Sequence, residues 1–579
     1  MDKEELARIL EKIADLLELK GENPFKVRAY RNAAKAILGL EKSLEEIIRE
    51  GKLLEIEGIG KSLADKIEQL ASKGKLAFYE KLKKSLPRGL LDLMQVQGLG
   101  PKKVVLLYKK LKIQSLSGLK KACLKGQIAK LKGFGEKTEK NILDSLEHRE
   151  EYQKRHLWWD GMEVATEILE GLKALKEASK AEIAGSLRRK METVGDLDFV
   201  VGSSNPKPVM KWFTSQPMVE KVIAKGETKA SVKLKGGMQA DIRIVPEHQF
   251  GFAFCYFTGS KEHTVKLREL SLKKSWSLSE YGFEGTKKGV VPKAFTRKEV
   301  SEEAIYKSLG LSFIPPELRE NRGEFEAAAK SEIPSLITDA DICGTLHNHT
   351  TSSDGRSTLK EMIQGAEKLK WEYLGISDHS KSSFQANGLS EERLLKQVEE
   401  IKKINASKEF SLYVFAGTEC DILPNGALDF SEKTLAKLDY VIASVHSSLT
   451  QDEKTMTKRM IKAIENPMTT ILGHPTGRLL LEREASKVNL LKIIDACIAN
   501  KKIIEINGHP KRLDMDWRFW RAAIEKGLLC CINTDAHAAD QHDYFRCGVN
   551  VARKGWIEKK QAINTMGLKE LQQFLKEMR

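Results

Sequence analysis

One short pattern occurs three times near the start of the chain: an apolar residue, any residue, glycine, an apolar residue and a second glycine. The glycine pairs are Gly58 with Gly60, Gly98 with Gly100, and Gly133 with Gly135. Apolar residues at helical spacing surround each copy, so each copy predicts two helices joined by a tight turn. Glycine accepts positive φ in such a turn and lets another backbone come close. A single copy is commonly a helix cap, but three copies argue against coincidence.

The helix that follows each turn begins with unpaired backbone N–H groups, and its dipole adds partial positive charge. Together they form a binding site for a phosphate. Lysines beside the turns, such as Lys61 and Lys103, add contacts that do not depend on base sequence. The three copies resemble helix-hairpin-helix motifs. That resemblance implies a protein that binds the DNA backbone without sequence preference.

Length and charge are consistent with several domains and an anionic partner. At about 100–200 residues per domain, a chain of 579 residues predicts several folded units. Its formal net charge of +16 is weak evidence for nucleic acid, because a basic balance also serves solubility. We find neither a membrane-spanning apolar run nor a signal peptide, so we expect a cytoplasmic protein with no membrane partner. The 8 cysteines are scattered without a CxxC, which predicts neither a disulfide framework nor a zinc ribbon.

Two aspartates, Asp196 and Asp198, stand two positions apart in a β-rich run. Side chains two apart on a strand project from the same face, so these carboxylates lie side by side and repel each other. A divalent cation relieves this repulsion, and oxygen ligands favour hard ions such as Mg²⁺ or Mn²⁺. Asp241 lies in another strand-like run. Three carboxylates on two strands predict a site that holds two metal ions against a triphosphate for in-line attack by a hydroxyl.

The sequence around these aspartates resembles the nucleotidyltransferase palm of family X DNA polymerases, to which DNA polymerase beta belongs. The resemblance implies that Asp196, Asp198 and Asp241 are catalytic metal ligands. It also implies a set of nucleotide-binding residues: Gly185, Ser186, Arg189, Gly195, Tyr256, Phe257, Gly259 and Arg268. Lys190 replaces the family's glycine, and Thr264 replaces its asparagine. We expect these two departures to affect dNTP affinity but, because the carboxylates are intact, to leave polymerase activity.

The first 85 residues resemble the small lyase domain of the same family. Apolar residues at helical spacing, interrupted at 21–24, predict two helices with a turn between them. The resemblance places Lys26, Tyr30 and Lys66 where the family binds a 5′-phosphate or forms a Schiff base with deoxyribose 5-phosphate. Ser62 replaces a phosphate-binding lysine, and Phe25 replaces a polar residue. These departures favour DNA binding over lyase chemistry for Lys66.

Histidines concentrate in the last part of the chain, where eight of the 12 lie after residue 346. His347 with His349, and Asp535 with His537, have period-two spacing, so each pair shares one face of a strand. Several of these residues follow short apolar runs and precede helical stretches such as 359–368, which predicts an alternating β/α chain with ligands at strand ends. Barrel active sites lie at such ends. Imidazoles with carboxylates suit Mn²⁺, Fe²⁺ or Zn²⁺.

This region resembles the PHP domain, a distorted β/α barrel with a site for up to three metal ions. The resemblance implies nine ligands, all of them present: His347, His349, Asp354, His379, Glu419, His446, His474, Asp535 and His537. It further implies phosphoester hydrolysis and, for PHP domains attached to family X polymerases, a 3′–5′ exonuclease with AP endonuclease activity in some members. We expect His509 and His542, which lie outside the ligand set, to be structural or surface residues.

The predicted fold is multidomain, with helical N-terminal domains, an α/β nucleotidyltransferase palm and a C-terminal distorted β/α barrel. The predicted boundaries are 1–85 for the lyase-like domain, 86–155 for the helix-hairpin-helix domain, 156–250 for the palm, 251–318 for the nucleotide-binding thumb, 319–340 for a linker rich in Glu and Ala, and 341–579 for the PHP nuclease domain. The resemblance covers nearly the whole chain.

The resemblance predicts a DNA-directed DNA polymerase that fills short gaps in base excision repair and trims 3′ ends. Its partners would be gapped or primed DNA and dNTPs, and we expect a monomer. One alternative is a DNA-end or gap-binding repair protein with weak polymerase and dominant PHP phosphoesterase activity, for which Lys190 and Thr264 are the clue. Another is a phosphatase of small phosphoesters that uses its amino-terminal half as a tether, which the three glycine turns disfavour.

Overall fold

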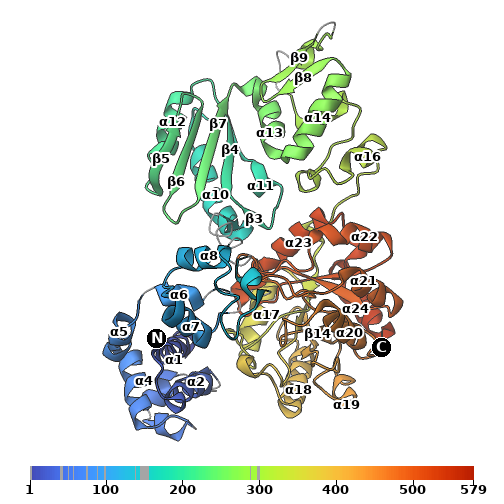
Figure 1. Cartoon of the computed structure of the whole chain (residues 1–579). Helices are drawn as coiled ribbons and strands as arrows, with labels where there is room; N and C mark the ends of the chain where they lie inside the picture. The colour runs from blue at the N-terminus through green and yellow to red at the C-terminus, as the bar shows by residue number, and fades with distance from the viewer. Residues whose placement is uncertain are drawn as a thin grey trace. The chain divides into compact units, whose positions relative to one another are not determined.

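The structure, a computed structural model, describes residues 3–38, 44–49, 51–56, 58–73, 76–87, 89–94, 96, 99–136, 138–143, 146, 155–286, 289–295 and 300–578. The chain forms two compact units, Met1–Gln153 and Lys154–Arg579. This division lies two residues before the predicted boundary after residue 155. The finer boundaries within each unit stay predictions. Figure 1 labels many of the helices and strands of both units.

The amino-terminal unit is built from short helices around one apolar core. α1 (Lys3–Lys20) buries Leu6, Leu10 and Ile13 along one face and packs against α2 (Pro24–Leu38). The two helices and the turn between them confirm the prediction for this segment. The unit further contains α3 (Leu44–Arg49), η1 (Lys52–Glu55), α4 (Lys61–Lys73), α5 (Ala77–Lys84), α6 (Gly89–Met94), α7 (Pro101–Leu111) and α8 (Leu116–Leu124).

In two of the glycine turns the first glycine has the positive φ that the sequence predicts, whereas the second glycines, Gly60, Gly100 and Gly135, do not. Gly58 has a φ of 86° and Gly133 a φ of 91°, in the left-handed region that favours glycine. The second glycine of each pair directly precedes a helix: Gly60 before α4, Gly100 before α7, and Gly135 before the helical residues 136 and 138–143. Gly98 lies outside the described residues.

The second unit begins with a five-stranded sheet in the order β2-β4-β7-β6-β5 (Figure 1). β4 and β7 are parallel neighbours, and the other pairs are antiparallel. The elements of this region are β1 (His156–Leu157), α10 (Trp158–Lys173), β2 (Lys180–Ile183), α11 (Gly185–Arg188), β3 (Thr193–Val194), β4 (Asp196–Gly202), α12 (Pro206–Thr214), β5 (Val219–Lys225), β6 (Lys229–Leu234), β7 (Gln239–Val245), η2 (Glu247–Gln249) and α13 (Phe250–Thr258).

Successive side chains of β4 point to opposite faces of the sheet, and the two faces pack against different neighbours. Leu197 and Phe199 belong to the core shared with α10 and α12. Val200, on the other face, packs with Phe250 and Ala253 of α13. Asp196 and Asp198 share this second face by their spacing, and both remain partly exposed. The carboxylates therefore lie away from the main core of the sheet.

A smaller region with an aromatic core follows the sheet. Phe252 of α13 meets Phe283 edge to face, with 5.1 Å between ring centroids. The strands β8 and β9 form an antiparallel hairpin over this core. The elements are α14 (Lys261–Lys273), β8 (Trp276–Ser279), β9 (Gly282–Gly285), η3 (Lys293–Phe295), α15 (Glu302–Ser308) and η4 (Pro316–Leu318).

The segment 319–340, predicted as a linker, is folded and packed. It contains α16 (Glu324–Ala329) and η5 (Asp339–Asp341), and the side chains of Arg319 and Glu324 are fully buried. Arg319 Nη1 lies 2.6 Å from Glu302 Oε1. Pairing of this kind compensates the burial of charge, which is why a charged composition did not reveal a buried segment.

The remaining residues form a distorted barrel whose strands are all parallel within the described range 300–578. The strands form one sheet of three and one of five: β10 (Gly344–Thr345), β11 (Tyr373–Ile376) and β12 (Tyr413–Ala416), then β13 (Glu419–Asp421), β14 (Ile442–Ser444), β15 (Ile471–Leu472), β16 (Ile503–Asn507) and β17 (Cys530–Asn533). Parallel bridges join the sheets, His379 to Glu419 on one side and Asn348 to Ala536 on the other.

Helices connect the barrel strands, as the alternating pattern predicts. They are α17 (Leu359–Lys368), η6 (Phe384–Ala386), α18 (Glu391–Ser407), α19 (Glu432–Leu435), α20 (Glu453–Ile464), α21 (Leu490–Ala499), η7 (Trp517–Phe519), α22 (Trp520–Glu525), η8 (Ala539–Tyr544), α23 (Phe545–Lys554), η9 (Lys559–Gln561), η10 (Ile563–Thr565) and α24 (Leu568–Glu577). The helix predicted over 359–368 is confirmed as α17. Among the described residues, we find no helix with the length and apolarity to cross a membrane.

Candidate metal centres and nucleic-acid interface

Three aspartates meet on the five-stranded sheet. Asp198 on β4 is the register partner of Asp241 on β7, and Asp196 lies two residues away on the same face of β4. Their carboxylate oxygens lie within 4.8 Å of one another. Burial, followed by repulsion from Asp196 and Asp241, raises the pKa of Asp198 to about 7. A divalent cation offsets that repulsion, so the three carboxylates fit hard metal ions.

Gly185 forms a turn directly against this carboxylate cluster. It has a φ of 60°, and a Cβ atom built at this position would lie 1.9 Å from Asp198 Oδ2. The backbone N–H of Ala184 donates to the Asp198 carbonyl at 2.8 Å. Ser186 follows in the same short turn of helix, α11. Glycine is therefore required at position 185 both for its conformation and for the space beside Asp198.

Two consecutive arginines join this turn to the end of α13. Arg188 Nη1 donates to the Thr258 hydroxyl at 2.6 Å, and Arg189 Nη1 donates to the Thr258 carbonyl at 2.8 Å. Arg189 Nε also donates to Glu320 at 3.0 Å. The structure thus brings together the two segments predicted to bind a nucleotide. Because protein groups already engage its guanidinium, the role of Arg189 as a phosphate ligand stays a prediction.

The segment after α13 carries the aromatic residues predicted to lie under the nucleotide sugar. The rings of Tyr256 and Phe257 meet edge to face at 5.4 Å between centroids. The Thr264 hydroxyl donates to the Tyr256 carbonyl at 3.4 Å, and a Cβ atom at Gly259 would lie 2.9 Å from Thr264 Oγ1. Thr264 therefore braces this turn. Arg268 is exposed on α14.

Lys190 lies in the left-handed backbone region that favours glycine. Its φ is 58°, and its Nζ lies 4.7 Å from the centroid of the Trp158 ring. Burial lowers the pKa of Lys190. The side chain is thus engaged by Trp158. Gly195 lies between β3 and β4, and a Cβ atom at this position would meet no atom within 4 Å.

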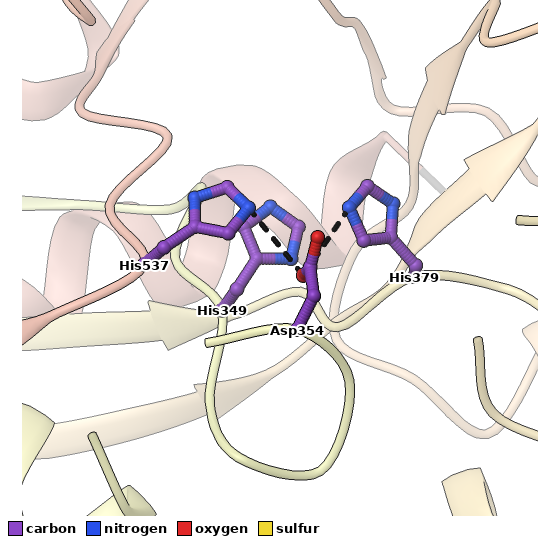
Figure 2. A group of neighbouring side chains, drawn as sticks. All are labelled: His349, Asp354, His379 and His537. Carbon is purple, nitrogen blue, oxygen red and sulfur yellow. Dashed lines mark ion pairs between the residues drawn. The ribbon is translucent and has the colours of Figure 1, made fainter. Parts of the chain in front are cut away.

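The nine residues predicted as PHP metal ligands converge at the ends of the barrel strands. Three overlapping groups have their ligand atoms within 4.8 Å of one another: His349, Asp354, His379 and His537; His347, His349 and Asp535; and His379, Glu419 and His446. His474 joins them through Glu419, with 2.7 Å between Nε2 and Oε1. Figure 2 shows Asp354 between two imidazoles, 3.6 Å from His379 Nε2 and 3.4 Å from His537 Nε2.

Several atoms of this cluster are buried without a hydrogen-bond partner among the described residues. They are His347 Nε2, both ring nitrogens of His349, His379 Nδ1, His446 Nε2, His474 Nδ1 and Glu419 Oε2. Buried polar atoms almost always have a hydrogen bond in proteins, and here the ligand atoms lie close to one another without one, His379 Nδ1 at 2.9 Å from Glu419 Oε2, so the cluster fits bound cations. Burial, with the neighbouring His537 and His379, lowers the pKa of His349 to about 4, which keeps its imidazole neutral and able to bind a metal.

Glu505 on β16 supports two of the histidines and lay outside the predicted set. Its Oε1 lies 2.7 Å from His347 Nδ1, and its Oε2 accepts from the backbone N–H of His474 at 2.8 Å. Outer carboxylates of this kind fix the tautomer and orientation of metal-binding histidines. The sequence offered one signal for Glu505, an acidic residue inside the apolar run of β16. This signal does not identify the role of Glu505, because the histidines that it contacts are distant in sequence.

Asp421 is a second supporting carboxylate that sequence reasoning missed. Its Oδ1 lies 2.7 Å from His446 Nδ1. It stands two residues after Glu419 on β13, so the period-two spacing that found His349 after His347 also applied here.

The two remaining histidines of the barrel lie outside the ligand groups. His542 is buried and donates from Nε2 to the Met362 carbonyl at 3.0 Å, so it is structural, as expected. His509 packs its ring edge to face against Tyr544 at 5.2 Å between centroids.

In the amino-terminal unit, the three residues that the lyase resemblance predicts to contact DNA surround one aromatic ring. Tyr30 stacks on Phe78 at 6.3 Å between centroids, and Lys26 and Lys66 each place Nζ 5.7 Å from the centroid of the same ring. Lys66 Nζ donates to the Ser62 hydroxyl at 2.6 Å. Burial lowers the pKa of Lys66, and Lys26 adds to this effect. Two neighbouring cations on an aromatic face suit a phosphate.

Four family models match separate parts of the chain. A helix-hairpin-helix domain matches residues 1–76, and a SAM-like helix-hairpin-helix tandem matches 90–148. A DNA polymerase beta thumb matches 253–320, and a PHP domain matches 345–509. These matches confirm the predicted combination of helical DNA-binding, polymerase and PHP regions.

Known relatives match either the whole chain or part of it. The DNA polymerase/3′-5′ exonuclease PolX of Bacillus subtilis (strain 168) is 39% identical over 578 residues, which cover 100% of both chains. A probable phosphatase of Thermoanaerobacter sp. (strain X514) is 28% identical over 242 residues, 40% of this chain and 93% of its own. A probable phosphatase of Clostridium acetobutylicum is 30% identical over 206 residues, 33% of this chain and 78% of its own. The chain therefore belongs to the bacterial family X DNA polymerases that carry a C-terminal PHP domain.

Proposed function

We propose that the protein is a DNA-directed DNA polymerase that fills short gaps in DNA repair, with a metal-dependent 3′–5′ exonuclease in its PHP barrel. The observation that carries this proposal is the presence of two separate clusters of metal-ligating residues in one folded unit. Three carboxylates on a sheet suit phosphoryl transfer from a triphosphate, and a histidine-rich cluster suits phosphodiester hydrolysis. The Bacillus relative, matched along its full length, is named for both activities.

In the palm, Asp196, Asp198 and Asp241 would hold two Mg²⁺ or Mn²⁺ ions. Ions bound there supply charge neutralisation at the triphosphate and help the primer hydroxyl to lose its proton. Gly185 leaves the backbone beside Asp198 open to the leaving phosphates, because it carries no side chain. Arg188 fixes the neighbouring aromatic turn through Thr258. The chain thereby positions the nucleotide against the primer, and positioning supplies much of the rate enhancement.

In the barrel, the nine predicted ligands would hold up to three ions of Mn²⁺, Zn²⁺ or Fe²⁺. Ions held by these ligands would supply activation of a water molecule and charge neutralisation at the phosphate. Glu505 and Asp421 hold the imidazoles of His347 and His446 in one orientation. The Asp354 side chain lies at the rim of the cluster and is one-third exposed. We expect the 3′ end of a strand to pass this residue when it reaches the metal ions.

DNA binding follows from family membership, and we assign it to two surfaces of the amino-terminal unit. One surface comprises the amides that open the helices after Gly60, Gly100 and Gly135. The other comprises Lys26 and Lys66 around Phe78. Both contact phosphates rather than bases, so gapped or primed DNA of any sequence would bind, and binding would weaken steeply with salt. We further propose that the protein acts as a cytoplasmic monomer on dNTPs, with the domain boundaries predicted above, except that 319–340 is a packed segment rather than a linker.

The departures at Lys190 and Thr264 are compatible with polymerase activity. The Lys190 ammonium lies over the Trp158 ring, and the Thr264 hydroxyl donates to the Tyr256 carbonyl. Both side chains thus support neighbouring structure, and the three carboxylates remain within metal-binding distance of one another. Gap binding of normal affinity without dNTP incorporation would instead favour the end-binding alternative.

A gapped duplex with a labelled primer tests both activities. With dNTPs and Mg²⁺ or Mn²⁺ the primer should lengthen to the end of the gap, and without dNTPs it should shorten from its 3′ end. EDTA should stop both reactions. A protein that lengthened no primer with either metal would overturn the polymerase assignment, and one that released no nucleotide would overturn the exonuclease assignment. A duplex with an abasic site, added under the same conditions, tests AP endonuclease activity.

A second candidate is a phosphatase of small phosphoesters, which the names of the two shorter relatives favour. Turnover of a 3′-ended oligonucleotide should exceed turnover of a sugar phosphate if the barrel is an exonuclease. The reverse order would favour the phosphatase. His347→Ala should abolish whichever reaction belongs to the barrel, which separates it from a contaminant.

A further inference from the structure

A cavity of about 440 Å³ lies outside both metal clusters, where the barrel meets the segment 319–340. Its wall gathers four cationic side chains and two tryptophans: Arg322, Arg518, Arg521, Lys554, Trp517 and Trp556. They come from the residues before α16, from η7, from α22, from α23 and from the turn that follows α23 (Figure 1). Glu525 is the carboxylate on this wall. Like charges repel, so four cations around one cavity favour an anionic occupant.

The two indole rings hold the cations in fixed positions. The guanidinium carbon of Arg521 lies 3.9 Å from the centroid of the Trp556 ring. Around Trp517, the guanidinium carbon of Arg518 lies at 4.5 Å and Lys554 Nζ at 4.6 Å. A guanidinium stacked on a ring keeps the N–H groups of its edge available for acceptors. The donors are thus arranged before any ligand arrives, which lowers the entropic cost of binding.

The cations of the wall have more hydrogen-bond donors than their carboxylate and carbonyl partners occupy. Arg518 pairs with Asp516 and Arg521 with Glu525, but each guanidinium has five N–H donors, so donors remain. Lys554 Nζ is already bound by Glu320 and by two carbonyls. Arg322 is exposed, and its guanidinium carbon lies 5.6 Å from the centroid of the Trp517 ring, with no carboxylate partner among the described residues. This residue is the most available cation of the wall.

Trp517 provides an independent sign of a missing acceptor. Its side chain lines the cavity and is 5% exposed, and its Nε1 has no hydrogen-bond partner among the described residues. A buried indole N–H normally finds an acceptor. Because Nε1 is itself covered, an oxyanion in the cavity would accept from it only after a small movement of the ring, and it would supply counter-charge for the arginines.

We propose that this cavity binds the phosphate of a nucleotide, presented either by a single DNA strand or by a free nucleotide, without a metal ion. The volume is within the range of small-molecule sites, about 300–1,000 Å³. The site adjoins the palm, because Lys554 Nζ also donates to the Arg189 carbonyl at 3.0 Å and Arg518 Nη1 lies 3.5 Å from Glu192. This inference deepens the proposed function, since single strands and nucleotides are its substrates and products.

The test measures binding by the full chain in EDTA, so that neither metal cluster contributes. The probes are a 5′-phosphorylated trithymidylate that carries 4-thiothymidine for cross-linking, and thymidine 5′-monophosphate. Binding at the cavity is read as the trithymidylate concentration for half-maximal cross-linking to the peptide that contains Trp517 or Arg322, because the amino-terminal surfaces also bind strand phosphates. Arg322→Glu and Trp517→Phe should each raise this concentration about tenfold, the loss expected for one charge-assisted hydrogen bond. Lys330→Glu makes the same charge change on an exposed residue of the same segment outside the cavity, and it should bind as the wild type does. The cross-link should map to the peptide that contains Trp517 or Arg322.

The outcomes distinguish a strand phosphate from a free nucleotide, or they exclude the site. Tight binding of the trithymidylate alone identifies a strand phosphate, and equal binding of the monophosphate identifies a free nucleotide. Equal affinity of the Arg322→Glu and Lys330→Glu variants, with cross-links elsewhere in the chain, would overturn the proposal. Because Trp517 is buried, the thermal unfolding midpoint of Trp517→Phe is measured first. If Trp517→Phe is unfolded, the result for Arg322→Glu alone tests the proposal. Primer extension and digestion by the wild type with metal are measured in parallel, so failure of the proposed function would be seen separately.

Discussion

Arg478 of the barrel donates a hydrogen bond to Glu192 of the palm, with 2.6 Å between Nη2 and Oε1. The two side chains are only 11% and 10% exposed. Arg478 stands four residues after His474, and its Nε donates to the Arg512 carbonyl at 2.9 Å. The side chain of Arg512 in turn lies 3.0 Å from Asp535 Oδ2. One buried ion pair thus connects the palm to two barrel loops that carry predicted metal ligands.

Loss of this ion pair should destabilise the second unit. Arg478→Ala leaves Glu192 buried without its closest cation, which should lower the free energy of unfolding by about 3 kcal/mol. Urea unfolding followed by tryptophan fluorescence measures this loss. The double variant Arg478→Ala with Glu192→Gln should recover part of it, because position 192 then no longer buries an unpaired charge, although Asp516 still lacks Arg478 as a partner. Strictly additive losses would show that the two side chains do not act as a pair.

Gly185→Ala should disable the polymerase without affecting the nuclease. The added methyl group would lie 1.9 Å from Asp198 Oδ2 in a backbone region with a φ of 60°, so the carboxylate or the turn must move. Displacement of about 1 Å at a catalytic group can cost about a hundredfold in rate. Primer extension and 3′ digestion, measured on the same preparation, test this expectation.

The matched control for that variant is Gly226→Ala in the β5–β6 hairpin. A Cβ atom there meets Lys229 O at 3.5 Å, an ordinary contact. Extension by this control should equal that of the wild type. Wild-type extension by Gly185→Ala itself would show that Asp198 is not held as described.

Glu505→Gln should weaken metal binding in the barrel. The carboxylate accepts from His347 and from the His474 amide, and loss of such an outer partner typically costs about 10–100-fold in metal affinity. The metal content after dialysis and the Mn²⁺ concentration for half-maximal 3′ digestion both report the change. Primer extension in the presence of excess Mg²⁺ should not change. An unaltered metal content would exclude a supporting role for Glu505.

Glu302 should contribute to the acid sensitivity of the second unit. Burial alone would raise its pKa, but Arg319 and Arg188 hold the pKa of Glu302 at about 2 instead of 4.5. A carboxyl group with a depressed pKa stabilises the fold above its unfolded value and loses that contribution as pH falls through the folded value. We therefore expect the wild type to lose stability between pH 4.5 and about pH 2.

The comparison for Glu302 is the variant Glu302→Gln, which lacks the titrating group. It should be less stable than the wild type at neutral pH, and its thermal unfolding midpoint should fall less on acidification over the same range. Parallel falls in the two proteins would assign the acid sensitivity to other groups.

Local spacing predicted the candidate metal ligands because a strand repeats every two residues. Asp196 with Asp198 and His347 with His349 stand two apart, and the structure places each pair in one cluster. Asp241 was also found, because its own run has strand character. In these cases the sequence signal lies within a few residues of the group that carries the chemistry.

Contacts between distant segments could not be predicted in the same way. Glu192 meets Arg478 across 286 positions of sequence, and neither residue stands in a distinctive local pattern. The folded segment 319–340 reads as a solvated linker because many of its residues are exposed and the charges that it buries are compensated by partners elsewhere, such as Glu302 for Arg319. Sequence patterns report local geometry, whereas compensation of buried charge is a property of the folded chain.

The most direct test of two independent active sites on one chain is a comparison of two variants on one labelled primer-template. Asp196→Ala should abolish extension with dNTPs and Mg²⁺ or Mn²⁺ but leave 3′ digestion at the wild-type rate. His347→Ala should abolish digestion and leave extension. Both activities lost together in either variant would contradict independent sites, and both retained in both variants would contradict the assignment of these residues to the chemistry.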